Sequence, residues 1–388
     1  MTRRLYYEDE YLCQFDARVE MCRPKEEGKW IVRLDRTAFF PEGGGQWADL
    51  GTLGEATVLD VHERDGEVEH LVDAPLTPGT QVHGCIDWER RFSVMQQHSG
   101  EHIFSGLVHA RFGYDNVGFH IGSEAVTMDF NGEITEAEAE EIETAANRVI
   151  FSNVPIEHFI PDEEARKTLE YRSKKEIEGE LRIVRIPGAD TCACCGTHLH
   201  RTGEIGQIKL IGVQKYKSGV RVSILCGLRA LMYERQIQAE MEKVHRLISS
   251  RPENCAAVIE QILVERKELQ YRNEQMAMQL FDVLSQGERA KPVRVVHCDA
   301  LTGDGTARAA GKLAEGAGIA LVTGGEGESV SFALCSVGMD VRPMTRAFCQ
   351  TFSGKGGGKP DMTQGKIRRT DPDILRKWLQ DNGSRSEP

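Results

Sequence analysis

Alternating apolar and polar residues, interrupted at short intervals by glycine, aspartate and proline, run through the first 90 residues of the chain. A period of two is typical of β-strands that bury one face. The alternation predicts four short strands, at residues 13–19, 29–34, 56–62 and 67–71. We therefore expect residues 1–90 to form a small antiparallel, barrel-like β domain.

The apolar pattern changes to helical spacing after this segment. Between residues 92 and 112 the apolar positions recur every three to four residues, which predicts a helix. His98 and His102 are one helical turn apart in this stretch, so their side chains share one face of the helix.

A second helix is predicted over residues 135–151, because Thr135 is a suitable N-cap and Glu138 completes a capping box. A cluster of cysteines and histidines follows, and strands are expected on either side of it, at residues 181–186 and 207–213. We therefore expect residues 91–227 to form an α+β domain with an α/β-sandwich architecture.

Residues 228–290 have the pattern of a helical connector that is broken near Pro252, a residue suited to the first turn of a helix. After the break a stripe alternates spacings of four and three, as in the seam of a coiled coil; it comprises Cys255, Ile259, Ile262, Arg266, Leu269, Asn273, Met276, Leu280 and Val283. Two arrangements fit this stripe. One is a homodimer through the connector, and the other is an intramolecular hairpin with the preceding helix, which carries a matching stripe of Ile237, Met241, Val244 and Ile248.

The last part of the chain, residues 291–388, mixes strand and helix patterns, which predicts a small α/β domain. Strands are expected at 293–298, 319–323 and 330–335, with a helix at 306–317. The longest apolar runs are far shorter than the roughly 18–20 residues that a membrane span needs. We predict no membrane segment.

Composition places the chain among globular proteins. With 388 residues, of which 40% are hydrophobic and 28% charged, it is long enough for two or three domains of roughly 100–200 residues. The chain start runs into acidic residues instead of the apolar segment of a signal peptide, so we expect a soluble, cytoplasmic protein. Eleven cysteines are too few for a disulfide scaffold, and three of them cluster at residues 192–195, which favours metal binding or catalysis.

The formal net charge of −12 argues against indiscriminate binding to nucleic acid, because the field of the whole molecule repels phosphates. The charge is unevenly distributed, however. Residues 340–377 contain nine basic and four acidic residues, a local charge of +5, whereas residues 133–143 contain six glutamates and no Lys or Arg. A local phosphate-binding surface near the C-terminus is compatible with this distribution.

Two short motifs predict a metal site. His98 and His102 can contact one ion from a helix, and Cys194 and His198 can do so from a turn in which Gly196 permits close wrapping. Three imidazoles and one thiolate suit Zn²⁺ better than Mg²⁺ or Ca²⁺. Spacing alone leaves the set open, since neighbours could replace two of these ligands: Cys192 or Cys195 for Cys194, and His200 for His198.

Four protein ligands are typical of structural zinc, so a catalytic interpretation requires that one ligand be displaced or that a position be left for water or substrate. The segment from His98 to His102 also matches the H-x-x-E-H pattern of inverzincin metallopeptidases, in which the glutamate, here Glu101, is the general base. The metallopeptidase leaves the Cys/His motif unexplained. The metallopeptidase is therefore the alternative, and the zinc site that includes the cysteine is the preferred interpretation.

A segment rich in glycine and lysine, residues 353–360, is expected to form a loop. It lacks the P-loop pattern, because Ser353 occupies the place of the first glycine and Pro360 follows Lys359. We predict no nucleotide site of the Walker type. Backbone N–H groups freed by the glycines suit a phosphate backbone instead, and basic residues flank them: Lys355, Lys359, Lys366, Arg368 and Arg369.

Four segments together resemble one family, in order and spacing, along nearly the whole chain. They are Thr37-Ala38-Phe39-Phe40-Pro41-Glu42-Gly43-Gly44-Gly45-Gln46, His98-x-x-x-His102, Asp190-x-x-x-Cys194-Cys195-Gly196-Thr197-His198 with Thr202-Gly203-Glu204-Ile205-Gly206, and Gly354-Lys355-Gly356-Gly357-Gly358-Lys359-Pro360-Asp361-Met362. The first three look like the editing domain of alanyl-tRNA synthetase and of the freestanding AlaX editing proteins. The fourth looks like the DHH-associated domain that ends the synthetase. The long AlaX form fits best, without the aminoacylation domain and its ATP site.

The resemblance implies a trans-editing hydrolase that removes a wrong amino acid, chiefly serine with glycine as a further candidate, from mischarged tRNA(Ala). It assigns one Zn²⁺ per chain to His98, His102, Cys194 and His198. It also implies that Thr37 senses the serine hydroxyl and that Gln46 lies in the editing pocket. Glu101 is then a candidate general base.

For binding to tRNA, the resemblance implies the DHH-associated domain and one basic residue of the editing domain. The candidates are Arg221, Gly354, Lys355, Gly356, Gly357, Gly358, Lys359, Lys366 and Arg368. A homodimer would form through the connector or the C-terminal domain. The remaining alternative is a non-catalytic tRNA-binding protein with purely structural zinc.

Overall fold

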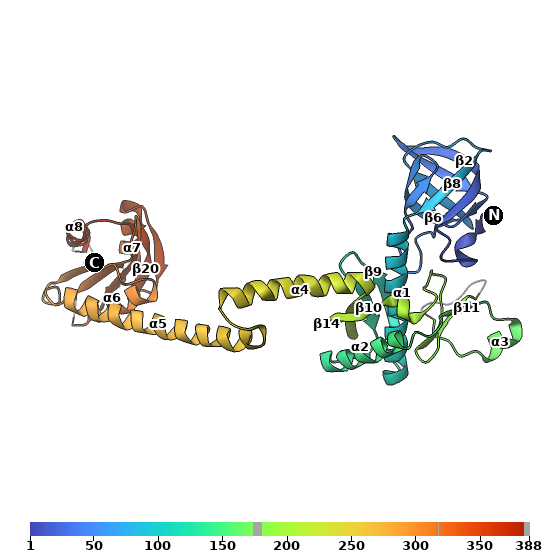
Figure 1. Cartoon of the computed structure of the whole chain (residues 1–388). Coiled ribbons are helices and arrows are strands. Elements are labelled where there is room, and N and C mark those ends of the chain that lie inside the picture. Colours follow the sequence, from blue (N-terminus) through green and yellow to red (C-terminus); the bar gives the residue numbers. More distant parts are fainter. Residues whose placement is uncertain (174–180, 317, 384–388) are drawn as a thin grey trace. The chain divides into compact units, whose positions relative to one another are not determined.

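The computed structural model describes residues 1–173, 181–316 and 318–383, and the chain divides into two compact units, Met1–Met241 and Glu242–Pro388 (Figure 1). Both units combine helices with sheets, which confirms a mixed α/β multidomain protein. The division between the units falls within helix α4 (Gly227–Leu247). Over the described ranges, no helix is long and apolar enough to cross a membrane.

The first unit begins with a closed antiparallel barrel, drawn in blue in Figure 1. Its strands, in barrel order, are β2 (Gln14–Glu26), β3 (Lys29–Leu34), β7 (Glu67–Val72), β6 (Ala56–Arg64), β5 (Gly51–Leu53) and β8 (Gln81–Ile86). The four strands predicted from alternation are confirmed as β2, β3, β6 and β7. Strand β8 was not predicted, because its inward position at Gly84 is not apolar. A Cβ at Gly84 would lie 2.5 Å from the Phe15 ring, so only glycine fits there.

A short parallel pair joins the start of the chain to the segment that precedes the glycine loop. Strand β1 (Arg3–Arg4) pairs with β4 (Arg36–Thr37), and a 3₁₀ turn, Leu5–Tyr7, follows β1. These contacts bring Tyr7 and Glu10 to the same side of the barrel as the loop 38–46.

The long helix α1 (Trp88–Phe112) is anchored to this side of the barrel by Arg91, which is 1% exposed. The Arg91 guanidinium donates to Asp49 Oδ1 at 2.8 Å and to the carbonyl oxygens of Ala38 and Glu10 at 2.7 and 2.8 Å. Asp87 caps the start of α1, and Gly113, at φ 71°, ends it. The helix predicted at 92–112 is confirmed and begins four residues earlier.

The middle of α1 is buried by the rest of the first unit. A sheet in the order β14-β15-β10-β9 and helix α2 (Glu136–Phe151) surround it. The sheet strands are β9 (Asn116–Ile121), β10 (Val126–Phe130), β14 (Ile208–Tyr216) and β15 (Gly219–Cys226). The predicted capping box between Thr135 and Glu138 is present at the start of α2.

A second, small antiparallel sheet carries the Cys/His motif. It consists of β11 (Glu157–Phe159), β12 (Ile183–Ile186) and β13 (Asp190–Ala193), and helix α3 (Glu163–Thr168) follows β11. The hairpin of β12 and β13 delivers the chain to Cys194 at the end of β13. Strands β12 and β14 confirm the two strands predicted around the cluster.

The second unit is a sheet covered on both faces. The strand order is β16-β17-β18-β20-β19, with β16 and β17 parallel and the other pairs antiparallel. Helices α5 (Cys255–Leu284) and α6 (Asp304–Ala314) pack on one face, and α7 (Arg342–Thr351) and α8 (Pro372–Gly383) on the other. The strands are β16 (Val293–Cys298), β17 (Ile319–Gly324), β18 (Ser329–Ser336), β19 (Lys355–Gly358) and β20 (Met362–Arg368). The last residue of the helix predicted at 306–317 lies outside the described residues.

The glycine- and lysine-rich segment was expected to be a loop, and this expectation was wrong. It forms the exposed edge strand β19, in which Gly356 pairs with Gly365 of β20. A Cβ at either glycine would lie under 3 Å from the Phe332 ring or from backbone atoms. The glycines therefore allow two strands to lie close to an aromatic side chain, a tertiary contact that the local sequence does not indicate.

The buried His70 of the barrel gives a testable pH dependence. Burial lowers the pKa of His70 to about 4, although its Nδ1 bonds the Val32 carbonyl oxygen at 3.1 Å. The unfolded chain takes up this proton near pH 6.5, so the folded state loses stability as the pH falls from about 6.5 to 4. We expect a loss of about 1.4 kcal/mol per pH unit, or about 3 kcal/mol in all. The measurement is the free energy of unfolding by denaturant, for wild type and His70→Gln, between pH 7 and 4. The two plots of this free energy against pH should differ by the stated slope, and parallel plots would contradict the lowered pKa of His70.

Candidate metal centre

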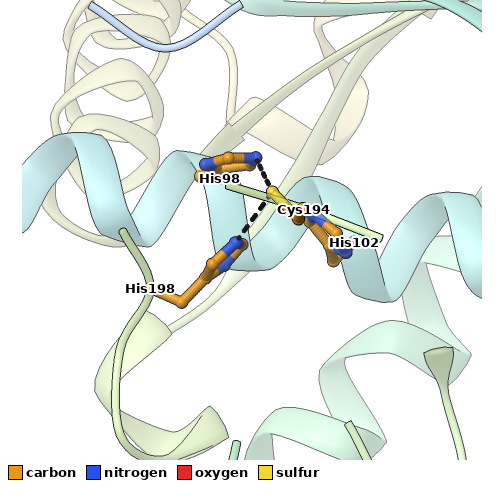
Figure 2. A group of neighbouring side chains, drawn as sticks. All are labelled: His98, His102, Cys194 and His198. Carbon is orange, nitrogen blue, oxygen red and sulfur yellow. Dashed lines mark hydrogen bonds between the residues drawn. The ribbon is translucent and has the colours of Figure 1, made fainter. Parts of the chain in front are cut away.

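Four side chains from two elements converge in the first unit (Figure 2). His98 and His102 project from α1, and Cys194 and His198 come from the turn that follows β13. The Nε2 atoms of His98 and His198 each lie 3.4 Å from Cys194 Sγ, and one donor atom from each of the four lies within 4.8 Å of the others. All three histidines are at most 2% exposed.

Each imidazole is fixed by a hydrogen bond at its outer nitrogen. Nδ1 of His98 pairs with Gln46 Oε1 at 2.9 Å, Nδ1 of His102 with Asp190 Oδ2 at 2.9 Å, and Nδ1 of His198 with Ser99 Oγ at 3.2 Å. Partners of this kind orient metal-ligating histidines in proteins. The arrangement leaves the three Nε2 atoms directed at the shared centre.

The donor set fits a tetrahedral zinc ion. Bond lengths of about 2.0–2.1 Å to nitrogen and about 2.3 Å to sulfur place neighbouring ligand atoms roughly 3.3–3.7 Å apart. The two measured separations from Cys194 Sγ agree with this range. Three nitrogens and one thiolate sulfur are also the ligand types that zinc prefers.

The surroundings of Cys194 and His198 shift their pKa values in the direction that favours binding of a cation. Burial alone would raise the pKa of the Cys194 thiol, but the charge of His98 and hydrogen bonds from His102 and His198 lower it well below its usual value. Burial lowers the pKa of His198 well below its ordinary value, so this imidazole keeps a free lone pair. The Cys194 thiol therefore loses its proton more readily than an ordinary cysteine does, which favours binding of a cation.

The competing ligands named by the sequence lie differently. Cys195 is exposed, and His200 is half exposed with its ring stacked on Tyr11 at 3.9 Å. Cys192 is buried and belongs to a second group with His102 and Asp190. The compact four-donor group thus contains Cys194 and His198 and excludes Cys195 and His200.

Asp190 is held in turn by an arginine. Arg172 donates from Nε to Asp190 Oδ1 at 2.8 Å and from Nη2 to Oδ2 at 2.9 Å. Charge-assisted pairs of this geometry are strong and directional. A continuous chain of hydrogen bonds therefore runs from Arg172 through Asp190 to the imidazole of His102. No sequence motif indicated Arg172.

The three residues expected in catalysis or in the pocket are all buried. Gln46 accepts from the Thr197 N–H at 3.1 Å and donates to Thr197 Oγ1 at 2.8 Å, besides holding His98. Thr37 Oγ1 pairs with His70 Nε2 at 2.9 Å inside the barrel. Glu101 lies on the side of α1 where its Oε1 accepts from Ser105 and Asn116 at 2.6 and 2.7 Å.

A cavity of about 520 Å³ opens beside the four side chains. Its wall combines the glycine loop with aromatic and basic side chains, among them Phe40, Gly43, Gly45, Phe119, Arg182 and Cys194. A Cβ at Gly45 would lie 2.6 Å from the Phe119 ring, and the Gly45 φ is 88°, so this loop requires glycine to reach strand β9. The volume lies within the range of small-ligand sites, roughly 300–1,000 Å³.

The residues expected to bind tRNA lie in both units. Arg221, in the first unit, is engaged by Asp129, which accepts from its Nε at 2.6 Å and its Nη2 at 2.8 Å. In the second unit, exposed Lys355 of β19 lies directly opposite exposed Lys366 of β20. Gly354 precedes β19, and Lys359 and Arg368 are exposed around the same edge.

The chain is similar to known proteins along most of its length. A family model described as threonyl and alanyl tRNA synthetase second additional domain matches residues 181–222. The alanyl-tRNA editing protein AlaX-L of Pyrococcus horikoshii is 28% identical over 98% of both chains. The alanyl-tRNA editing protein Aarsd1 of Danio rerio is 28% identical over 95% of this chain and 96% of its own.

The alanine–tRNA ligase of Thermofilum pendens is 32% identical over 95% of this chain but only 42% of the ligase. The similarity to the editing proteins, in contrast, spans nearly the full length of both partners. Along nearly its whole length the chain is therefore similar to the AlaX-type alanyl-tRNA editing proteins.

Proposed function

We propose that this protein is an aminoacyl-tRNA deacylase that hydrolyses, in trans, the ester bond of mischarged tRNA(Ala), chiefly the seryl ester. The observation that carries the proposal is the buried group of three imidazoles and one thiolate at the wall of a cavity. The cavity, at about 520 Å³, is far larger than a seryl group and has room for part of the terminal aminoacyl-adenosine. Full-length similarity to two alanyl-tRNA editing proteins supports the same substrate class.

One Zn²⁺ per chain would be held by His98, His102, Cys194 and His198, and when bound it supplies Lewis-acid polarisation of an oxygen. The protein's own residues contribute by fixing the positions of the metal ligands and of the substrate ester. Gln46, Asp190 and Ser99 fix the imidazoles, while the glycine loop and Phe119 shape the wall that orients the ester. An amino-acid ester is intrinsically labile, so orientation and stabilisation of the developing oxyanion are sufficient without a covalent nucleophile.

Two roles taken from the family require specific movements or proton paths here. To sense a substrate hydroxyl, Thr37 would have to release its bond to His70. To act as general base, Glu101 would use Oε2, which is 4.0 Å from His102 Nε2, because Oε1 holds Ser105 and Asn116. Thr37→Val is expected to reduce the preference for the seryl over the alanyl ester. An alanyl ester would leave the buried Thr37 hydroxyl without a partner, and the variant removes this penalty against the alanyl ester.

The experiment that tests the proposed function compares release of serine and alanine from charged tRNA(Ala), with and without a chelator. We expect selective release of serine that the chelator abolishes. Binding of charged tRNA with both esters intact would instead favour a tRNA-binding protein with structural zinc. Zinc-dependent cleavage of peptides, without deacylation, would favour the metallopeptidase.

The second unit is proposed to hold the tRNA body through the edge formed by β19 and β20. Like charges on directly opposite strand positions, as in Lys355 and Lys366, destabilise a sheet unless an anion lies between them. In the described part of the chain, neither lysine has a carboxylate within ion-pair distance. Strand β19 is the edge strand of its sheet, so its side away from β20 is open to a phosphate.

Replacing both Lys355 and Lys366 with alanine is expected to weaken tRNA binding and to lower the slope of log K against log salt by about 1–2, as expected for two lost phosphate contacts. The measurement is a salt titration of tRNA affinity. Arg308→Ala with Lys312→Ala is the matched control, because it removes two charges of the same unit that already pair with Glu274 and Asp282. An equal loss in both double variants would point to net charge alone and contradict a local site.

A homodimer through α5 is proposed from the coiled-coil stripe. Ala277 and Phe281 pack on the sheet of the second unit. Six apolar residues of the stripe are instead between 37% and 63% exposed; they are Ile259, Ile262, Leu269, Met276, Leu280 and Val283. Sedimentation of wild type and of Leu269→Glu should show a dimer that the substitution dissociates. All eleven cysteines are free, which fits the reducing cytoplasm in which we propose that the protein acts.

A further inference from the structure

The turn that carries Cys194 and His198 is held from outside by Arg182, which stands just before β12 and is 8% exposed. Its Nη1 donates to the Gly196 carbonyl oxygen at 2.8 Å and reaches the Cys194 carbonyl oxygen at 3.5 Å. Its own carbonyl oxygen accepts from the Cys194 N–H at 3.0 Å. The backbone and the side chain of Arg182 therefore both hydrogen-bond the turn that supplies Cys194 and His198.

The first ten residues of the chain hold Arg182 in place. Nη2 pairs with Glu10 Oε1, and the Arg182 guanidinium lies over the Tyr7 ring, 5.1 Å from its centroid. Glu10 is 5% exposed and also accepts from His158 Nδ1 at 2.8 Å. The guanidinium is thus fixed by a carboxylate, a ring and two carbonyl oxygens, while one side of it faces the cavity.

We propose that Arg182 is a positioning residue for the metal-binding turn, and that Glu10 and Tyr7 orient it. The inference rests on the proposed zinc-dependent function. A planar guanidinium can bond two carbonyl oxygens and a carboxylate at once, which a lysine ammonium on a flexible stem cannot do in the same geometry. Without this fork, the Gly196 carbonyl loses a buried partner, and the turn is free to carry Cys194 Sγ and His198 Nε2 away from His98.

The test uses the full chain with Arg182→Lys. This substitution keeps the positive charge but loses the planar guanidinium that bonds two carbonyl oxygens and a carboxylate at once. Zinc affinity is measured by competition with a chromogenic chelator. The geometry at Cys194 is read from the thiolate-to-metal absorption of the protein loaded with Co²⁺. We expect the zinc dissociation constant to rise about 10- to 100-fold, the cobalt band to shift, and kcat for serine-charged tRNA to fall more than KM changes.

Arg91→Lys is the matched control. Arg91 is also a buried arginine that bonds two carbonyl oxygens and a carboxylate, but it contacts neither Cys194 nor Gly196. Thermal unfolding of both variants with saturating zinc measures the general cost of losing a buried arginine. Equal losses of thermal stability with unchanged zinc affinity and cobalt spectra in both variants would overturn the proposal and leave Arg182 a merely structural residue.

Glu10→Gln keeps the proposal testable if Arg182→Lys does not fold. It preserves the shape of the acceptor but weakens its hold on Arg182, so a rise of at least about 3-fold in the zinc dissociation constant is expected, and an unchanged value would overturn the inference. A wild-type protein that binds no zinc would overturn the proposed function and this inference together. Normal zinc binding and deacylation in Arg182→Lys would overturn the inference alone.

Discussion

Replacing His102 with alanine is expected to abolish zinc binding and deacylation together. His102 contributes one of the four donors, and it is the end of the chain formed with Asp190 and Arg172, so its loss also leaves a buried carboxylate short of one partner. A metal ion supplies several kcal/mol of transition-state stabilisation, so deacylation should fall by roughly 10³-fold or more. Metal content and the rate of serine release from charged tRNA(Ala) are the two measurements.

The thermal stability of the same variant gives an independent readout. Zinc that binds only the folded state stabilises it by mass action, so a chelator should lower the melting temperature of wild type but not of His102→Ala. His109→Ala is the matched control, because His109 lies on the same helix, is partly exposed, and pairs through Nδ1 with Asp115 and the Tyr114 carbonyl oxygen and not with the four-donor group. Full activity of His102→Ala with retained zinc would show that the four-donor group is not the metal centre.

The two motifs that contain the four proposed ligands could be found in the sequence because their signals are local, and the family resemblance then selected Cys194 and His198 from their neighbours. Two histidines one turn apart share a helix face, and Cys194 and His198 are separated by a short turn with a glycine. The groups that orient them come from distant parts of the chain, such as Gln46 beside His98 and Asp190 beside His102. No spacing rule connects such residues, since their proximity is a product of the tertiary fold.

The same limit explains which parts of the fold were not predicted. Strands with alternating apolar residues were predicted, but β8 was not, because the ring of Phe15 fills the place of a side chain at Gly84. Likewise, the glycines of β19 indicate a loop when considered alone, and form a strand because Phe332 lies beneath them. The bond between the Thr37 hydroxyl and His70, 33 residues away, is likewise a tertiary contact that no local motif indicates.

Gly196→Ala is expected to have the second-largest effect. A Cβ at this position would lie 2.2 Å from Cε1 and 2.5 Å from Nδ1 of His98, and 2.7 Å from Gln46 Oε1. His98 and Gln46 are at most 2% exposed, so neither can move aside without leaving its partners. Overpacking of this kind costs about 1–3 kcal/mol of folding stability. Because the clash falls on a metal-facing imidazole, we also expect zinc affinity to fall by about 100-fold or more.

Gly212→Ala separates this clash from the general cost of adding a methyl group to a glycine of the same unit. Gly212 lies in β14, no atom lies within 4 Å of a Cβ built there, and its φ is not positive. This control should keep wild-type zinc affinity and wild-type deacylation. If Gly196→Ala also bound zinc as tightly as wild type, the turn would have to yield by more than an ångström. The clasp of Arg182 on the Gly196 carbonyl would then be too weak to position the metal ligands.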